Sequence, residues 1–222
     1  MTDLVLTVQG SARAELAPER ATVRFTIASD GPDRAPVVTA VTAALTAVTD
    51  ELGTRATSGT LESWSVDQLS VGAQRPWTND GTQAPLVHRA SATGRVVLDS
   101  PEGAAGLVDA LAAHTLVSID AVEWTLTDAS LSSAYAEVRE RSVADAVAKA
   151  TVLATAAGRS AVTAVALADP GMLDGSSPGH SPQPRFEKSM AMAMDAGGVG
   201  GFSLRPQPII IEVDVDARFT AR

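Results

Sequence analysis

Apolar and polar residues alternate along several stretches of the chain, a pattern typical of strands with one buried face. The most regular stretch runs from Ile209 to Phe219, where every second residue is apolar. Its opposite face carries the carboxylates of Glu212, Asp214 and Asp216. The same period of two predicts further strands at about residues 4–8, 21–29, 61–71, 87–98, 116–127 and 161–168. Gly10 is expected to end the first of these strands, and a bulge is expected near Asp120.

Three segments change to the period of a helix, with an apolar residue every three or four positions. The first follows Asp33, a plausible N-cap, and is expected to stop at Gly53. The second follows Ser100-Pro101-Glu102, a hydroxyl N-cap with Pro and an acid behind it. The longest covers about residues 130–157, ahead of Gly158, and the middle of its stripe is mostly Ala. Small residues there allow the helix to approach a sheet closely.

The order of these elements, roughly β-β-α-β-β-α-β-α-β-β, predicts the fold class α+β. We expect a mixed or antiparallel sheet with helices packed on one face, built from two β-α-β-β-like halves and one long helix in the C-terminal half. Residues 1–222 then form a single domain, with two interlocked subdomains of about 1–99 and 100–222 as the alternative. Residues 169–208, rich in Gly, Ser, Pro, Met and Ala, are expected to form a long flexible loop.

Composition narrows the classes of function. The net charge of −9, without any run of Lys or Arg, argues against nucleic acid and against an anionic membrane surface as partners. No cysteine is present, which excludes disulfides and thiolate sites. No apolar window reaches the length of a membrane span, and no signal peptide is evident, so we expect a cytoplasmic protein. Only 2 of the 17 basic residues are Lys, which with the Ala and Val bias indicates a GC-rich, bacterial source.

Residues that could perform catalysis or bind metal are few. Gly175-Ser176-Ser177-Pro178-Gly179 matches the G-x-S-x-G pattern of a hydrolase nucleophile, but no strand precedes Ser177 and no helix follows it, which favours a linker. The histidines, His88, His114 and His180, lack metal-binding spacing, and no phosphate-binding glycine loop occurs. We therefore expect no metal site, no cofactor and no catalytic residue.

Three polar or polarizable patterns remain. The row of Glu212, Asp214 and Asp216 could attract a cation, although a solvated strand face explains it as well. On the long helix, Asp145 and Lys149 have the favourable order for an i,i+4 ion pair on the surface. The alternating Met190, Met192 and Met194 form a possible interface, either added as a strand to a neighbouring sheet or packed between subunits, because Met adapts to irregular contacts. A disordered tether is the alternative for this tract.

The order of these segments, with four local strings, resembles the SIMPL domain family, also called DUF541. The strings are Val8-Gln9-Gly10 through Pro18-Glu19-Arg20-Ala21, the strand 122–127, the helix stretch 141–150 continuing to Gly158, and the tract 190–194. Glu19 stands where the family usually has Asp, and the family's second early glycine is absent. The likeness extends over nearly the whole chain.

This resemblance implies a fold rather than a reaction, because the family has no established catalytic residues. Many bacterial members are exported to the cell envelope, some assemble into large homo-oligomers, and a mammalian relative associates with a signalling kinase. We therefore expect a non-enzymatic, homo-oligomeric assembly or scaffold module that binds itself. The alternatives are a regulatory adaptor that binds another protein, and a hydrolase that uses Ser177.

Overall fold

The computed structural model describes residues 3–76, 83–173 and 204–222. Within them the chain forms three α-helices, one short 3-10 helix and eight strands, and every strand pairing is antiparallel. The predicted α+β class is therefore confirmed. The elements divide into two compact units, neither of which is continuous in sequence. In the described part of the chain, unit 1 comprises residues 3–17, 126–173 and 208–222, and unit 2 comprises residues 18–76, 83–125 and 204–207.

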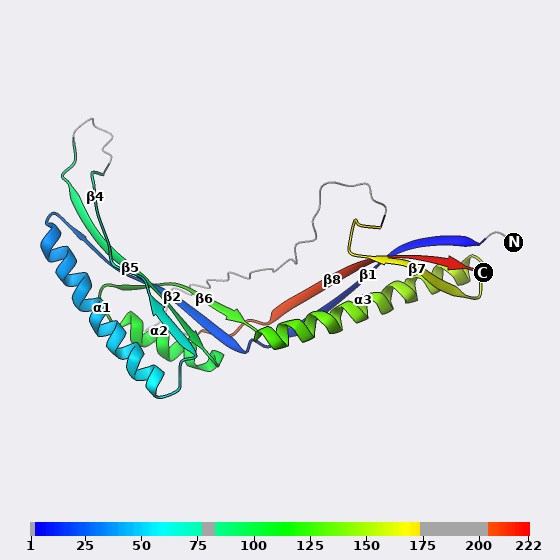
Figure 1. Cartoon of the computed structure of the whole chain (residues 1–222), viewed down its shortest axis with the longest axis horizontal. Helices are drawn as coiled ribbons and strands as arrows, with labels where there is room; N and C mark the ends of the chain where they lie inside the picture. Colours follow the sequence, from blue (N-terminus) through cyan, green and yellow to red (C-terminus); the bar gives the residue numbers. More distant parts are fainter. Residues whose placement is uncertain (1–2, 77–82, 174–203) are drawn as a thin grey trace, which may run out of the picture. The chain divides into compact units, whose positions relative to one another are not determined.

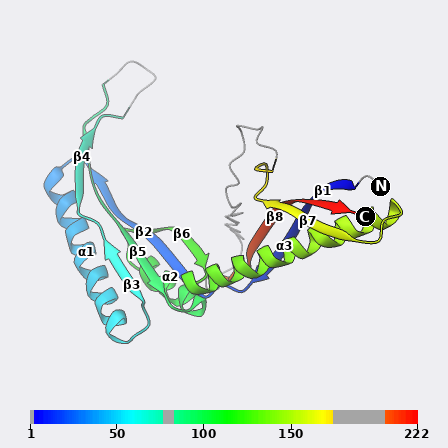
Figure 2. The same cartoon turned by 45° about the vertical axis from the view of Figure 1, so that its right-hand side comes forward.

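Unit 1 is a three-stranded sheet with one helix on it. Strand β8 (Ile209–Ala221) lies in the centre, between β1 (Leu4–Leu16) and β7 (Val162–Ala168). Helix α3 (Asp128–Ala156) runs along β1 and β8, as both Figure 1 and Figure 2 show. The predicted apolar face of β8 packs against this helix: Ile209 is partly buried, and Ile211, Val213, Val215, Ala217 and Phe219 are buried, as is Ala221 beyond the predicted stretch. Because α3 contributes Ala134, Ala146, Ala150 and Ala154 to the buried layer, it lies close to the sheet.

Unit 2 is a larger sheet with two helices on one face. Its strands are β2 (Arg20–Gly31), β3 (Ser63–Val66), β4 (Ser70–Gln74), β5 (Val87–Leu98) and β6 (Val117–Thr125), ordered β3-β5-β2-β6 with β4 also pairing with β5. Helix α1 (Arg34–Thr57) and, after the 3-10 turn η1 (Pro101–Gly103), helix α2 (Ala104–Ala112) share one core with this sheet. The largest fully buried side chain of this core, Phe25, lies over Gly94. A Cβ added to Gly94 would come within 2.2 Å of the Phe25 ring.

Several predicted boundaries are wrong for identifiable reasons. Strand β1 continues past Gly10 to Leu16, because this glycine provides room for α3 rather than ending the strand. The single strand predicted at 61–71 is two strands, β3 and β4. Helix α1 continues through Gly53 to Thr57. Ser100 precedes η1, but its hydroxyl donates to Glu102 instead of capping a backbone N–H.

Other local predictions are confirmed. The register between β2 and β6 shifts at Arg24 and Phe25, which leaves Asp120 as the extra residue of a bulge. Helix α3 begins two residues earlier than predicted, where the Thr127 hydroxyl accepts a hydrogen bond from the backbone N–H of Ser130. Its end at Ala156, with Gly158 at φ 74°, agrees with the predicted stop.

Helix α1 is the one described helix whose length and hydropathy would suffice to cross a membrane. The apolar stripe that raises its hydropathy consists of Val37, Val41, Val48 and Leu52, which are buried in the core of unit 2. The rest of its surface is mostly Ala and Thr. The Thr hydroxyls donate hydrogen bonds back to the helix, as that of Thr46 does to the carbonyl of Thr42. Packing against the sheet therefore accounts for the apolar stripe of this helix.

Candidate functional site

Several residues singled out from the sequence lie outside the described part of the chain. These are Ser177, His180 and the three methionines, Met190, Met192 and Met194. The serine nucleophile and the methionine interface therefore stay predictions. Of residues 169–208, those at 169–173 form a turn after β7, in which Gly171 has φ 79° and donates its N–H to Asp216.

The two described histidines occupy different parts of unit 2. His88 lies on β5 and is half-buried, opposite Gly31 of β2. His114 follows α2, and its Nε2 lies 3.0 Å from a carboxylate oxygen of Glu51 on α1. Arg55 bonds the same carboxylate from the next turn of α1, at 3.0 Å. The hydrogen bond with His114, more than the contacts with Arg55, lowers the pKa of Glu51, while desolvation opposes this shift.

This cluster links two helices and has the geometry of a structural contact. Glu51 joins α1 to the end of α2 through His114, and both side chains are about a quarter exposed. Among residues 3–76, 83–173 and 204–222, no group of three or more His, Asp or Glu side chains is placed to hold a metal ion. The cluster therefore contributes to the packing of α1 against α2.

The carboxylate row of β8 lies on the face of the unit 1 sheet that is turned away from α3. Glu212 faces Arg13 of β1 at 3.7 Å, an exposed pair of small energetic value. Asp216 accepts hydrogen bonds from the Gln9 side chain and from the backbone N–H of Gly171. Two of the three carboxylates thus bind groups of unit 1 itself, which agrees with a strand face that needs no external cation.

The most informative feature of unit 1 is the edge of β1. In an antiparallel pair, alternate residues direct their N–H and C=O groups toward the partner strand and away from it. The Ser11 N–H and the Gln9 C=O both bond to α3 rather than to β8. Odd-numbered residues of β1 therefore face the open edge. Val5 and Thr7 belong to this set, and their backbone groups have no partner within the described chain.

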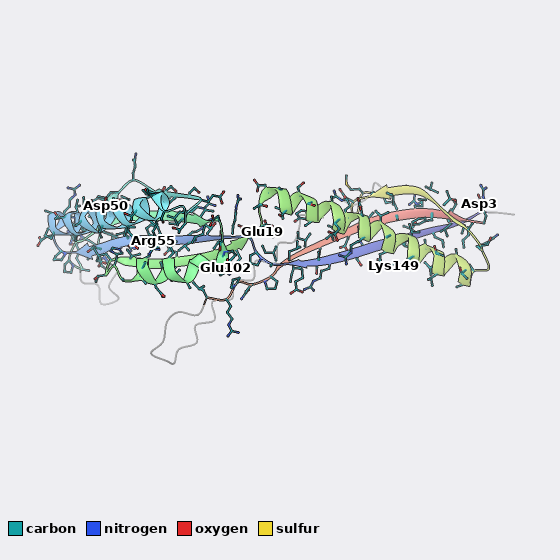
Figure 3. The ribbon with its side chains drawn as sticks, turned by 90° about the horizontal axis from the view of Figure 1, so that it is seen from below. Asp3, Glu19, Asp50, Arg55, Glu102 and Lys149 are labelled. Atoms are coloured by element: carbon teal, nitrogen blue, oxygen red, sulfur yellow. The ribbon has the colours of Figure 1, made fainter. Side chains whose placement is uncertain are left out.

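Two side chains of α3 occupy the middle of this edge. Asp145 accepts the Ser11 N–H at 2.8 Å, and Lys149 donates to the Gln9 C=O at 3.0 Å. The two side chains also form an ion pair at 2.7 Å, with Lys149 visible on α3 in Figure 3. The hydrogen bond from Lys149, followed by that from Ser11, lowers the pKa of Asp145. We call these two residues the edge latch, because they block strand pairing at Gln9 and Ser11.

A groove opens beside the latch, between β1 and α3. It measures about 530 Å³ and is lined by Val8, Gln9, Ala148, Lys149, Val152 and Leu153. Val152 is 68% exposed and Leu153 is 48% exposed, so its helix wall presents apolar surface to solvent.

Sequence reasoning identified the Asp145–Lys149 pair but not its contact with β1. The spacing i,i+4 signals an ion pair on a helix and contains no information about a neighbouring strand. The signal that was available is the combination of Gly10 with the small residues Ser142 and Ala146, because all three allow a strand and a helix to meet backbone to backbone.

Comparison with known families gives one result. A family model described as "SIMPL: Protein of unknown function (DUF541)" matches residues 6–219, nearly the whole chain. Comparison with curated proteins finds no match. The matched range includes all the strands and helices of both units except the first two residues of β1 and the last two of β8.

Proposed function

The chain belongs to the SIMPL family, whose function is unknown, and we propose that it is a non-enzymatic module that assembles with copies of itself. The observation that supports this proposal is the uneven distribution of exposed apolar side chains. Eight large apolar residues of the described chain are exposed, and only Leu86 belongs to unit 2. The other seven belong to unit 1: Val5, Val147, Val152, Leu153, Val165, Leu167 and Met172.

The construction of unit 1 explains why Val165 and Leu167 of β7 are exposed. A single helix cannot cover a three-stranded sheet completely, and α3 lies over β1 and β8 rather than over β7. Apolar surface concentrated in one part of a protein is typical of an interaction site. Unit 2 has two helices on its sheet and leaves far less of such surface exposed.

The energies support association through this surface. Burying a half-exposed Val, Leu or Met gains about 1 kcal/mol, so interfaces that covered all seven residues of unit 1 would supply at most roughly 7 kcal/mol. Association costs about 4–15 kcal/mol in lost freedom of motion. The gain from apolar burial is therefore close to the cost of association. Hydrogen bonds or further contacts must supply the remaining free energy.

Size-exclusion chromatography with light scattering tests the proposal on the full chain. We expect a mass that is a multiple of 22.7 kDa at micromolar concentration. Because each copy has a net charge of −9, added salt should strengthen the association by screening repulsion. A monomer at every salt concentration would overturn the proposal.

Matched variants locate the association surface in unit 1. Leu153→Glu places a charge in the groove and should weaken association, whereas Leu86→Glu makes the same change in unit 2 and should leave it unchanged. Equal effects of both variants would argue against unit 1 as the surface. A monomer that binds a different protein through the Leu153 region would instead support the regulatory adaptor, and esterase activity abolished by Ser177→Ala would support the hydrolase.

A further inference from the structure

Both edges of the unit 1 sheet have open stretches of similar length. On β1 the stretch lies before the edge latch and includes the backbone groups of Val5 and Thr7. On β7, Ala161 exchanges hydrogen bonds with Arg222, so the alternation directs Val162 and Ala164 to the open edge. A register shift between Ala164 and Ala166 ends that stretch. Each edge thus offers two alternate residues whose backbone groups have no partner in the described part of the chain.

We propose that the β7 edge of one copy pairs in parallel with the β1 edge of a second copy, before the edge latch, so that unit 1 sheets join head to tail. This inference rests on the proposed self-association and specifies its contact. Within one copy, β1 and β7 are both antiparallel to β8 and therefore run in the same direction. A sheet that repeats with its helices on one face consequently places β7 of one copy parallel to β1 of the next.

The side chains support this arrangement. Leu167 is opposite Ala217, whose side chain is buried on the α3 face, so Leu167 lies on that face too, and it is 51% exposed. If the open stretches of the two edges are aligned, Leu167 comes level with the groove beside Val8, because it follows Ala164 by three residues. The exposed Val152 and Leu153 of the groove then surround it. The groove receives a leucine, and both groups of apolar residues become buried.

Strand pairing and apolar side chains are both needed to make the contact large enough. Four residues of paired strand extend over only about 13 Å, which is too short for a specific interface by itself. Leu167 from one copy, with Val152 and Leu153 from the other, adds apolar area to the paired strands, toward the roughly 1,000 Å² that a specific interface needs. A contact of β1 with a second β1 would leave Val165 and Leu167 exposed. Head-to-tail pairing buries both edges and generates rings or filaments.

The absence of cysteine from the chain makes a direct test possible. Thr7→Cys and Thr163→Cys each place one thiol on an exposed position of β1 or β7, on the face away from α3. The two variants are mixed, allowed to exchange, and treated with a bis-maleimide long enough to bridge adjacent strands. We expect a cross-linked dimer in the mixture and none with either variant alone. Ser65→Cys, exposed on β3 of unit 2, replaces Thr7→Cys as the control and should give no product with Thr163→Cys.

The outcomes separate this inference from the proposed function. Light scattering that shows oligomers, without a Thr7–Thr163 cross-link, overturns the head-to-tail contact and leaves self-association standing. A cross-linked dimer from Thr7→Cys alone also overturns it, because that product requires β1 to meet β1. Monomers by light scattering overturn both. Leu167→Asp should abolish the cross-link while the far-UV circular dichroism of the chain stays unchanged, and Leu86→Asp should leave the cross-link intact.

Discussion

The contact between β1 and α3 at Gly10 leads to the most direct prediction about the stability of unit 1. A Cβ added at this position would lie 2.0 Å from the backbone oxygen of Ser142 and 2.7 Å from the Cβ of Ala146. Two of the atoms that it meets, the Ser142 oxygen and the Ala146 nitrogen, belong to the helix backbone, so no side-chain rotation can relieve the clash. Gly10→Ala therefore forces the strand and the helix apart.

The cost can be estimated from the packing it disturbs. Overpacking a buried site costs about 1–3 kcal/mol when side chains can adjust. Here the fully buried Ser142 and Ala146 must move with α3, so we expect a loss of about 3 kcal/mol in the free energy of unfolding. The shift should also disturb the edge latch, because Gln9 and Ser11 flank Gly10.

Urea unfolding followed by far-UV circular dichroism measures this change. Tryptophan fluorescence is the wrong probe, because the two tryptophans among the described residues, Trp64 and Trp124, both belong to unit 2. Gly106→Ala is the matched control, since a Cβ there meets nothing within 4 Å, and an alanine inside α2 should stabilise by about 0.5–1 kcal/mol. A Gly10→Ala protein within about 0.5 kcal/mol of the wild type would refute the reasoning about this contact.

Three further predictions concern single side chains. Thr127→Ala removes the cap of α3 and should cost about 1 kcal/mol in urea unfolding, whereas Thr115→Ala, at an exposed position, should cost much less. The pKa of Glu51 is lowered in the folded chain, so its stabilising effect is present above the ordinary value of 4.5 and is lost as pH falls through the folded pKa. Glu51→Gln should therefore flatten the loss of stability below about pH 4.5, by at most about 1 kcal/mol, and an unchanged pH profile would contradict this role. Asp145→Ala opens the edge latch and should increase the assembly mass or the tendency to aggregate, as seen by light scattering, because a longer stretch of β1 can then pair.

Local patterns were sufficient to predict the α+β class, the long helix α3 and the buried face of β8. They could not predict which strands pair, because period-two alternation is the same whatever strand lies alongside. The pairing of Leu4 with Ala221, and hence the discontinuous unit 1, has no local signal. Gly10 was misinterpreted for the same reason, since a glycine that ends a strand and one that admits a helix have the same sequence pattern.

The groove and the latch were beyond prediction because each combines residues of β1 and α3 that are more than 130 positions apart. The i,i+4 rule identified Asp145 and Lys149 as a pair, and the structure confirms their contact at 2.7 Å. Their second partner becomes apparent only when β1 is placed beside the helix. The exposed apolar residues were equally hidden, because Val165 and Leu167 have the ordinary composition of a buried strand.

The pairing of β1 with β8 also determines when unit 1 can form during protein synthesis. β1 leaves the ribosome first, but its partner follows about two hundred residues later, and residues 18–125 of unit 2 emerge in between. Since domains fold as units while the chain grows, those residues can fold before β1 has its partner strand. β1 therefore has no partner strand until β8 has been made. The three-stranded sheet of unit 1 can form only after β8 has been released.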